Sequence, residues 1–284
     1  MGTWNGNWFP SGRAKHRAAR EVEDARISEA AQMLSDGLSK IDPEGTNDVI
    51  LCLNEIRSPA VATNLISKIG RKGLKLAAIS RYRWSDRFDQ QQDVIATTLP
   101  VVDSHWSVWK KKSSVKPPRG YVFTSVVIDG VVTANVYAVH LKSNYGQGKD
   151  EKKIEDNRRK RSIAIEQIVE MEKPRRRSFR RPVIVAGDLN ADKRRKEFSQ
   201  DTIFKTLDES GFCDVYLNMP EEERYTTEHR YFGKSAIDYI FYRDFSVCGV
   251  PEALAVKNVS DHRALFALLD VNKNIVFEKE KKEN

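Results

Sequence analysis

The chain has 284 residues, of which 40% are hydrophobic and 31% charged, and this length and composition fit one large α/β domain or two small ones. No apolar run approaches the roughly 20 residues of a membrane-spanning helix, and three cysteines without a CxxC pair argue against a zinc site or a disulfide framework. The net charge of +8 suits a polyanionic partner, although 40 acidic residues offset most of the excess.

The first predicted element is a short strand in "MGTWNGNWF", which resembles the end of a strand whose beginning is missing. Nothing at this terminus resembles a signal peptide. A natural start and a trimmed start both fit the pattern. An export signal removed earlier is therefore an open alternative, and the sequence does not settle the compartment.

Helices and strands alternate through the first half of the chain. Apolar residues at helical spacing predict a helix over 17–40 and another over 59–70. Between them, "NDVILCLNEI" is a continuously apolar run, typical of a strand buried on both faces, in which Cys52 serves as a small hydrophobe. Further strands are predicted at 74–80, 93–102, 104–109, 121–130 and 131–141, with AspGly joining the last two as a hairpin.

The second half continues this mixture of elements. An amphipathic helix is predicted over 150–172 and a shorter one over 196–210. Strands are predicted at 181–190, 236–242, 245–256 and 264–271. Because we find no internal repeat and no long linker, we expect a single α/β sandwich domain over 1–272. The charged residues 273–284 form a C-terminal tail.

Polar residues of metal-ligand or acid–base type stand at the ends of several predicted strands. They are Asn5, Glu55, His140, Asp188, Asn190, Asp238, Asp261 and His262. Strand ends on one edge of a sheet converge, so these groups are expected to share a pocket. Carboxylates held a few ångströms apart repel by several kcal/mol without a cation between them. A hard divalent ion, above all Mg²⁺, resolves that cost, and two histidines beside it indicate phosphate-ester chemistry.

Each of these motifs also has a structural explanation when taken alone. GlyAspLeuAsn at 187–190 is more often a turn than a site, SerAspHis at 260–262 can be a helix cap or a loop, and His140 can be a satisfied core histidine. Glu55 is harder to dismiss, because a carboxylate that follows a buried apolar run needs a partner. The ordered co-occurrence of all the motifs favours a functional site.

These motifs together resemble the endonuclease/exonuclease/phosphatase superfamily over nearly the whole chain. In order they are TrpAsn (4–5), LeuAsnGluIle (53–56), ValHisLeuLysSer (139–143), GlyAspLeuAsn (187–190), IleAspTyrIle (237–240) and SerAspHisArg (260–263). The resemblance implies a deoxyribonuclease I-like fold, a four-layer α-β-β-α sandwich of two mixed β-sheets flanked by helices. It also implies that the site lies at one end of the sheets.

The resemblance also implies roles for individual residues. Glu55 corresponds to the principal Mg²⁺ ligand, with Asn5 and Asp261 beside the metal. Asp188 and Asn190 correspond to the pair that orients the attacking water and holds the phosphate.

Both histidines have counterparts in the superfamily. His262, paired with Asp238, corresponds to an Asp–His couple that acts as a base or as a stabiliser of phosphate charge. His140 corresponds to a histidine that contacts the phosphate or assists the leaving group. The resemblance implies Mg²⁺ as cofactor, with Mn²⁺ as a substitute.

Some positions depart from the family pattern. ValHisLeuLysSer replaces the tyrosine-bearing motif of abasic-site nucleases, which disfavours a dedicated repair nuclease. Asp93 stands where relatives carry a glycine, and the carboxylate partner of His140 is open among Asp86, Asp89 and Asp93. Arg57, Lys142 and Asn144 are candidate phosphate contacts, with a surface salt bridge as the default explanation for each.

Three basic segments stand out, at 158–161, 173–181 and 193–196. They are either solvated faces or a surface that follows a phosphate backbone. A surface that follows a phosphate backbone, joined to the predicted site, leads us to expect a Mg²⁺-dependent nuclease that acts on DNA or RNA. We expect a monomer without an obligate protein partner. One alternative is a phosphodiesterase or phosphatase for a lipid headgroup or a phosphorylated small molecule. Another is an inactive member that only binds polyanions.

Overall fold

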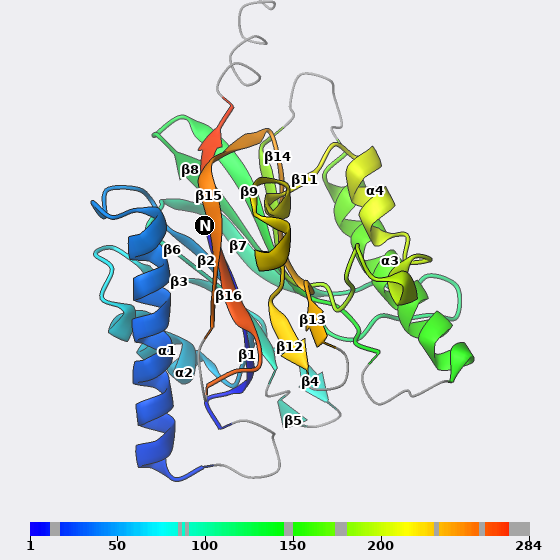
Figure 1. The fold of residues 1–284 in the computed structure, drawn as a ribbon, viewed down its shortest axis with the longest axis horizontal. Helices are drawn as coiled ribbons and strands as arrows, with labels where there is room; N and C mark the ends of the chain where they lie inside the picture. Colours follow the sequence, from blue (N-terminus) through cyan, green and yellow to red (C-terminus); the bar gives the residue numbers. More distant parts are fainter. Residues whose placement is uncertain are drawn as a thin grey trace, which may run out of the picture.

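The computed structural model describes residues 1–11, 18–84, 87–88, 91–144, 150–173, 181–229, 233–255 and 259–272. Two six-stranded mixed sheets pack face to face, with helices on their outer faces (Figure 1). This confirms the expected four-layer sandwich. The proposed tail at 273–284 lies outside the described residues. Among the described residues, no helix is both long enough and apolar enough to span a membrane.

The first sheet combines the N-terminal strands with the last two strands of the chain. Its order is β15 (Phe245–Ala255), β16 (Arg263–Val271), β1 (Gly2–Phe9), β2 (Ile50–Ile56), β6 (Gln92–Thr97) and β3 (Lys75–Ile79). β1 runs parallel to β2 and antiparallel to β16, so the two ends of the described chain meet in the middle of the sheet.

The second sheet is built from the middle of the chain. Its order is β11 (Cys213–Asp214), β14 (Asp238–Arg243), β10 (Val183–Asp188), β9 (Val132–His140), β8 (Gly120–Ile128) and β7 (Val101–Val108). The expected hairpin joins β8 to β9, with Ile128 opposite Val132. Asp129 and Gly130 form its turn with positive φ angles of 51° and 74°.

Two helices cover the outer face of each sheet (Figure 1). They are α1 (Arg20–Ile41) and α2 (Pro59–Ile69) on the first sheet, and α3 (Glu151–Met171) and α4 (Ile203–Glu209) on the second. Local caps define two of the boundaries. Ser58 accepts from the amide of Val61 where α2 begins, and Asp150 accepts from Lys153 where α3 begins.

The fully buried strand β2 shows how the layers are filled. Ile50 and Cys52 contribute to the core between the sheets, while Leu51 and Leu53 contribute to the cluster beneath α1 and α2. Successive side chains of a strand point to opposite faces, so a strand between two cores must be apolar throughout. The interpretation of Cys52 as a small buried hydrophobe is confirmed.

The prediction of one helix over 196–210 is wrong in its first half. A 3₁₀ turn spans Lys196–Phe198 and α4 begins only at Ile203. The break holds Asp201, whose carboxylate binds the buried guanidinium of Arg161. The sequence pattern also did not reveal three short pairings, namely β11 on β14, β12 (Thr227–His229) with β13 (Gly233–Ser235), and β4 (Arg83–Trp84) with β5 (Arg87–Phe88).

Candidate active site

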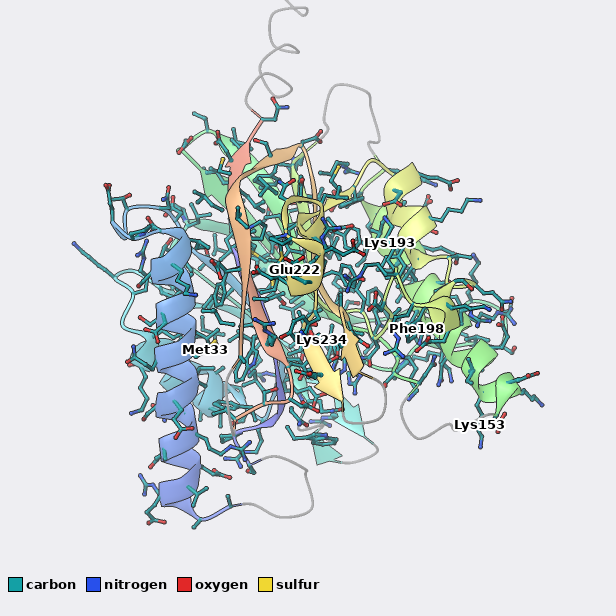
Figure 2. The ribbon with its side chains drawn as sticks, viewed as in Figure 1. Met33, Lys153, Lys193, Phe198, Glu222 and Lys234 are labelled. Carbon is teal, nitrogen blue, oxygen red and sulfur yellow. The ribbon has the colours of Figure 1, made fainter. Side chains whose placement is uncertain are left out.

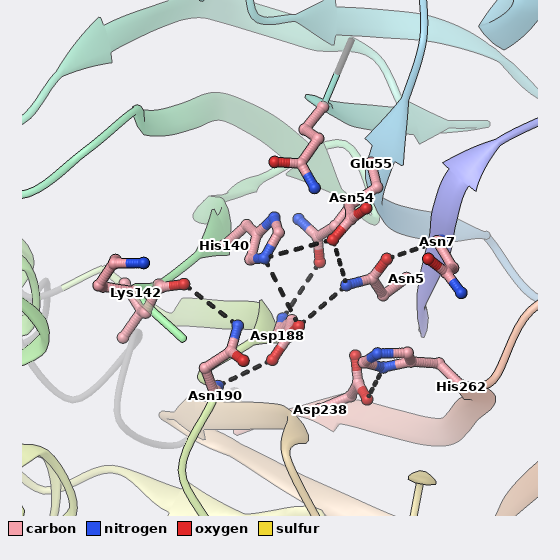
Figure 3. Close-up of polar contacts among 12 residues, drawn as sticks. Asn5, Asn7, Asn54, Glu55, His140, Lys142, Asp188, Asn190, Asp238 and His262 are labelled. Atoms are coloured by element: carbon pink, nitrogen blue, oxygen red, sulfur yellow. Dashed lines mark hydrogen bonds and ion pairs between the residues drawn. The ribbon is translucent and has the colours of Figure 1, made fainter. Parts of the chain in front are cut away.

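The predicted strand-end residues gather at one end of the two sheets (Figure 3). In the second sheet, Asp188 of β10 lies opposite His140 of β9 on one side and Asp238 of β14 on the other. In the first sheet, Asn5 of β1 lies opposite Asn54 of β2, and Glu55 follows directly. The strand register therefore brings residues that are far apart in sequence into one cluster.

Two asparagines join the sheets at this point. Nδ2 of Asn5 donates to Oδ2 of Asp188 at 2.9 Å and to Oε1 of Glu55 at 3.3 Å. Oδ1 of Asn54 accepts from the backbone amide of Asp188 at 3.1 Å. Asn54 is fully buried, and we did not single it out in the sequence. The signal that could have identified Asn54 is its position directly before Glu55 in LeuAsnGluIle (53–56).

Gly187 permits the close approach of the two sheets. A Cβ at this residue would lie 2.0 Å from the carbonyl oxygen of Val139 and 2.9 Å from Oδ1 of Asn54. Its φ of 139° also lies outside the range of ordinary side chains. The glycine of GlyAspLeuAsn is therefore required by packing at the site, beyond any preference of turns for glycine.

Glu55 and Asn190 occupy left-handed backbone conformations, with φ angles of 59° and 52°. Neither is a glycine, and such conformations persist where surrounding contacts determine them. Oε2 of Glu55 accepts from the amide of Trp8 at 2.9 Å. The Asn190 amide N–H donates to Oδ1 of Asp188 at 2.8 Å, and Nδ2 of Asn190 donates to the carbonyl of Leu141 at 3.1 Å. Both side chains are thus held in place by the backbone around them.

His262 and Asp238 form the predicted couple, with 2.7 Å between Nδ1 and Oδ2. The hydroxyl of Thr226 accepts from the Asp238 amide at 3.1 Å, and the hydroxyl of Ser260 accepts from the His262 amide at 3.0 Å. Burial alone would lower the pKa of His262. The charge and hydrogen bond of Asp238 outweigh it and raise that pKa to about 10. This imidazole is therefore fixed in orientation with Nε2 as its free nitrogen.

His140 has the opposite environment. Its Nε2 lies 3.6 Å from both Oε1 of Glu55 and Oδ2 of Asp188, while its buried Nδ1 has no hydrogen-bond partner among the described residues. Burial, followed by the positive charges of Arg119 and His262, holds the pKa of His140 well below its usual value. The ring is therefore a neutral imidazole.

Asp93 is not the carboxylate partner of that histidine. Its two oxygens accept from Nδ2 of Asn54 at 2.7 Å and from the hydroxyl of Tyr82 at 3.2 Å. Asp93 instead supports Asn54, which in turn binds the Asp188 amide. The other two candidates, Asp86 and Asp89, lie outside the described residues.

Four other predicted residues lie around this centre. The side chain of Asp261 is 66% exposed, with Oδ1 3.9 Å from Nε2 of His262. Lys142 is half-buried, and burial together with Arg119 lowers its pKa. Oδ1 of Asn144 accepts from Nη1 of Arg161 at 3.2 Å.

Arg57 forms a salt bridge. Both of its terminal nitrogens bind the carboxylate of Glu23 in α1, with 2.6 Å between Nη2 and Oε2. The salt-bridge explanation therefore describes this residue.

The basic segments are largely engaged with neighbouring acids where the structure describes them. In 158–161, Arg158 pairs with Glu155, Lys160 with Asp156, and Arg161 is buried against Asp201. In 193–196, three of the four cations pair with carboxylates; these pairs are Lys193–Asp208, Arg194–Asp192 and Arg195–Glu197. Residues 174–180 lie outside the described residues. The first segment is therefore not the open phosphate-binding surface that its composition suggested.

The donor set fits a hard divalent cation. One side-chain oxygen or nitrogen of each of Asp188, Asp238 and His262 lies within 4.8 Å of the others, so acidic groups are concentrated here. Glu55 adds a carboxylate that shares the Asn5 amide with Asp188. Burial, then the charge of Asp238, raises the pKa of Asp188 to about 7, so these carboxylates are short of compensating positive charge. Oδ1 of Asp238 is also buried without a hydrogen-bond partner among the described residues. Oxygen-rich, acidic surroundings of this kind suit Mg²⁺ or Mn²⁺.

Solved structures share this architecture at low sequence identity. An endonuclease/exonuclease/phosphatase family protein from Leptotrichia buccalis has a TM-score of 0.63 at 15% identity, covering 95% of this chain and 98% of that one. Humanized D. rerio TDP2 has a TM-score of 0.63 at 16% identity, with coverage of 95% and 98%. The human Nocturnin catalytic domain with bound sulfate has a TM-score of 0.60 at 17% identity, with coverage of 95% and 94%.

The similarity to these structures shows the fold only. The family is identified by comparison of the sequence with family models. No match was found among curated proteins. A family model does match, over residues 2–262, which include every strand-end residue of the site. The chain therefore belongs to the endonuclease/exonuclease/phosphatase family.

Proposed function

We propose that the protein is a Mg²⁺-dependent phosphodiester hydrolase and that its substrate is a nucleic acid. The observation that carries the proposal is the meeting of Glu55, Asp188 and the His262–Asp238 couple at one end of the sheets. Proteins of this family are generally phosphoester hydrolases. The site provides the groups that such a reaction needs, namely a water-orienting carboxylate, donors for phosphate oxygens and a place for a cation.

The residues divide the reaction between them. Asp188, with its carboxylate held by Asn5 and Asn190, orients the attacking water and is placed to take its proton as the new P–O bond forms. His262 presents Nε2 to the phosphate because Asp238 holds its Nδ1. His140 faces the same space as a neutral ring and assists as the bond to the leaving oxygen breaks. Asn190 is fixed beside them by Leu141.

Glu55 and Asn5 are the residues that would hold Mg²⁺, with Asp261 nearby on the exposed side of His262. When bound, the ion neutralises the non-bridging phosphate oxygens and the charge that develops on the leaving group. Nδ2 of Asn5 donates to the carboxylates of Glu55 and Asp188, so Asn5 would hold these two acids in place beside the ion. The acidic donor set is consistent with this assignment.

A cavity beside the site supports a polyanionic substrate. Its volume is about 520 Å³, and its lining residues are Asp192, Arg194, Arg195, Glu221, Glu222, Arg224, Tyr225 and Lys234. Asp192 is satisfied internally, because Oδ2 accepts from the Ala236 amide at 2.8 Å. Nζ of Lys234 rests 4.2 Å from the centre of the Tyr225 ring. Lys234 and Glu222, both labelled in Figure 2, are exposed residues of the cavity lining. Tyr225 precedes Thr226, whose hydroxyl binds the Asp238 amide. Arg194 and Arg195 pair with Asp192 and Glu197, so phosphates flanking the cleaved one would meet Lys234 and Arg224 here.

The test is cleavage of plasmid and single-stranded DNA, and of RNA, with Mg²⁺, Mn²⁺ or chelator, at two salt concentrations. We expect metal-dependent cleavage that weakens as salt rises, because phosphate contacts displace counterions. Glu55→Gln should lose most of the activity and raise the Mg²⁺ concentration needed. A panel of sphingomyelin, phosphoinositides and a generic phosphodiester tests the alternative substrates. Hydrolysis of one of these without any cleavage of nucleic acid would reject the proposed substrate.

A further inference from the structure

The segment that follows His140 has no secondary structure, yet side chains hold its backbone throughout. Residues 141–144 lie between the end of β9 and the start of α3. Three consecutive carbonyls each accept from a different side chain. Leu141 is bound by Nδ2 of Asn190 at 3.1 Å, Lys142 by Nη1 of Arg161 at 2.7 Å, and Ser143 by Nδ2 of Asn157 at 3.1 Å.

Arg161 is the centre of this arrangement. Its side chain is 0% exposed, and it reaches out from α3 beneath the segment. Nε and Nη2 bind the two oxygens of Asp201 at 3.2 and 2.5 Å, and Nη1 also binds Oδ1 of Asn144 at 3.2 Å. The guanidinium lies 5.7 Å from the centre of the Phe198 ring. A rigid planar fork can serve a carboxylate and a backbone carbonyl at once, which a lysine cannot reproduce.

The segment is tied directly to the cluster of catalytic groups. The Leu141 amide donates to the carbonyl of Asp188 at 2.8 Å, and the Leu141 carbonyl holds the amide of Asn190. A shift of residues 141–142 would therefore displace Asn190 and the end of β9 that carries His140. Ordering an irregular segment costs backbone entropy. The bonds of Arg161 to Lys142 and Asn144 favour the ordered conformation of this backbone.

We infer that Arg161 and Asp201 are positioning residues that fix segment 141–144 and, through it, align Asn190 and Lys142 with the substrate phosphate. The catalytic part of this inference rests on the proposed phosphodiesterase function. The fixing of the segment does not, because it follows from the contacts of Arg161 alone. Neither residue touches the reacting atoms, so the expected effect is on kcat more than on the affinity for substrate.

The test is the double variant Arg161→Met/Asp201→Leu, which replaces the pair with apolar side chains of similar size. Such replacements of buried ion pairs are often neutral for stability, whereas removal of one partner alone leaves a buried charge. We expect a folded protein whose kcat falls by about 10- to 100-fold, because small misplacements in an active site cost rates of this order. Backbone amide NMR relaxation should show increased motion at residues 142–144 and unchanged motion in β10, both relative to the parent protein.

The matched control is Arg71→Met/Asp42→Leu, which removes another largely buried Arg–Asp pair, located between α1 and α2. It should change thermal stability and leave kcat and the motion of 142–144 as in the parent. If Arg161→Met/Asp201→Leu does not fold, Arg161→Lys keeps a cation beside Asp201 and loses the fork that also binds the Lys142 carbonyl, so it should lower kcat a few-fold with increased motion at residues 142–144.

A folded double variant with parental kcat and parental amide relaxation would overturn the inference, and so would an Arg161→Lys variant with both parental values. If the parent hydrolyses no phosphodiester, the proposed function fails. Amide relaxation then still decides whether Arg161 and Asp201 fix the segment.

Discussion

The two histidines of the site face one another from different sheets and differ in how they are held. His262 is bound at Nδ1 by Asp238 and at its backbone by Ser260. His140 has a buried Nδ1 without a partner among the described residues, and only Nε2 lies near Glu55 and Asp188. One ring is therefore oriented by a charged hydrogen bond at Nδ1, whereas the other has its Nε2 beside two carboxylates and no partner at Nδ1 among the described residues.

This difference separates their chemistry. The charge of Asp238 outweighs burial and raises the pKa of His262 to about 10, whereas burial and nearby positive charges lower the pKa of His140. Pairs of titratable groups whose surroundings push their pKa values apart commonly divide acid and base work between them. We therefore expect His262 to provide a directed charge to the phosphate and His140 a buried contact without charge.

The largest effect is expected from His262→Ala. The variant loses the oriented nitrogen and leaves the buried Asp238 without its partner, so we expect kcat/KM to fall by about 10²- to 10⁴-fold. Steady-state hydrolysis of the best substrate measures it. His105→Ala removes a half-exposed histidine of β7 and serves as the control. A His262→Ala variant as active as that control would remove His262 from the reaction.

The second effect tests whether Asp238 acts through His262. Asp238→Asn keeps the size of the side chain and removes its charge, so we expect a loss of about 10²-fold in kcat/KM. The double variant Asp238→Asn/His262→Ala should be no worse than His262→Ala alone, because residues that act as a unit are not additive. Strictly multiplicative losses would show that the two side chains work independently.

The sequence predicted the ends of strands better than the contacts between them. Glu55, His140 and Asp188 could be identified because each is polar at the end of an apolar run, and Asp238 because it interrupts one; the strand pairing then brings them together. The fold followed from the order of such runs and from the family motifs. These signals are local, and they depend on burial and strand period, which a single sequence displays.

Contacts that depend on the meeting of two sheets could not be predicted in this way. Asn54 resembles any buried polar residue until β10 lies against it, and Asp93, one of three candidate partners of His140, binds Asn54 instead. Arg161 lies in a basic segment for which a solvated face and a phosphate-binding surface were both open, and only the structure shows that it points inward to Asp201. Charge composition does not reveal which cation is buried.

A smaller effect is expected at His140. His140→Gln keeps a polar group near Glu55 and Asp188, while His140→Ala leaves an empty buried space. Because no partner among the described residues orients Nδ1, we expect Gln to retain more activity than Ala, with losses of about 10-fold and about 10²-fold in kcat. Rates for substrates with good and poor leaving groups measure the role. The loss should be larger for the poor leaving group, and equal losses for both would argue against assistance to the leaving oxygen.

The smallest effect on rate is expected at Asn54, which supports Asp188 between the two histidines. Asn54→Leu keeps most of the volume but leaves the Asp188 amide and one oxygen of Asp93 without this partner. Each unsatisfied buried group costs about 1–3 kcal/mol, so the free energy of unfolding should fall measurably in urea. Activity should fall only a few-fold, because Asn5 and Asn190 still hold the Asp188 carboxylate.

The control is Asn135→Leu, which changes another buried asparagine, one that binds Ser125 and Glu172 near the opposite end of β9. It should lower stability without changing kcat, and a similar loss of kcat in both variants would show that Asn54 acts through stability alone.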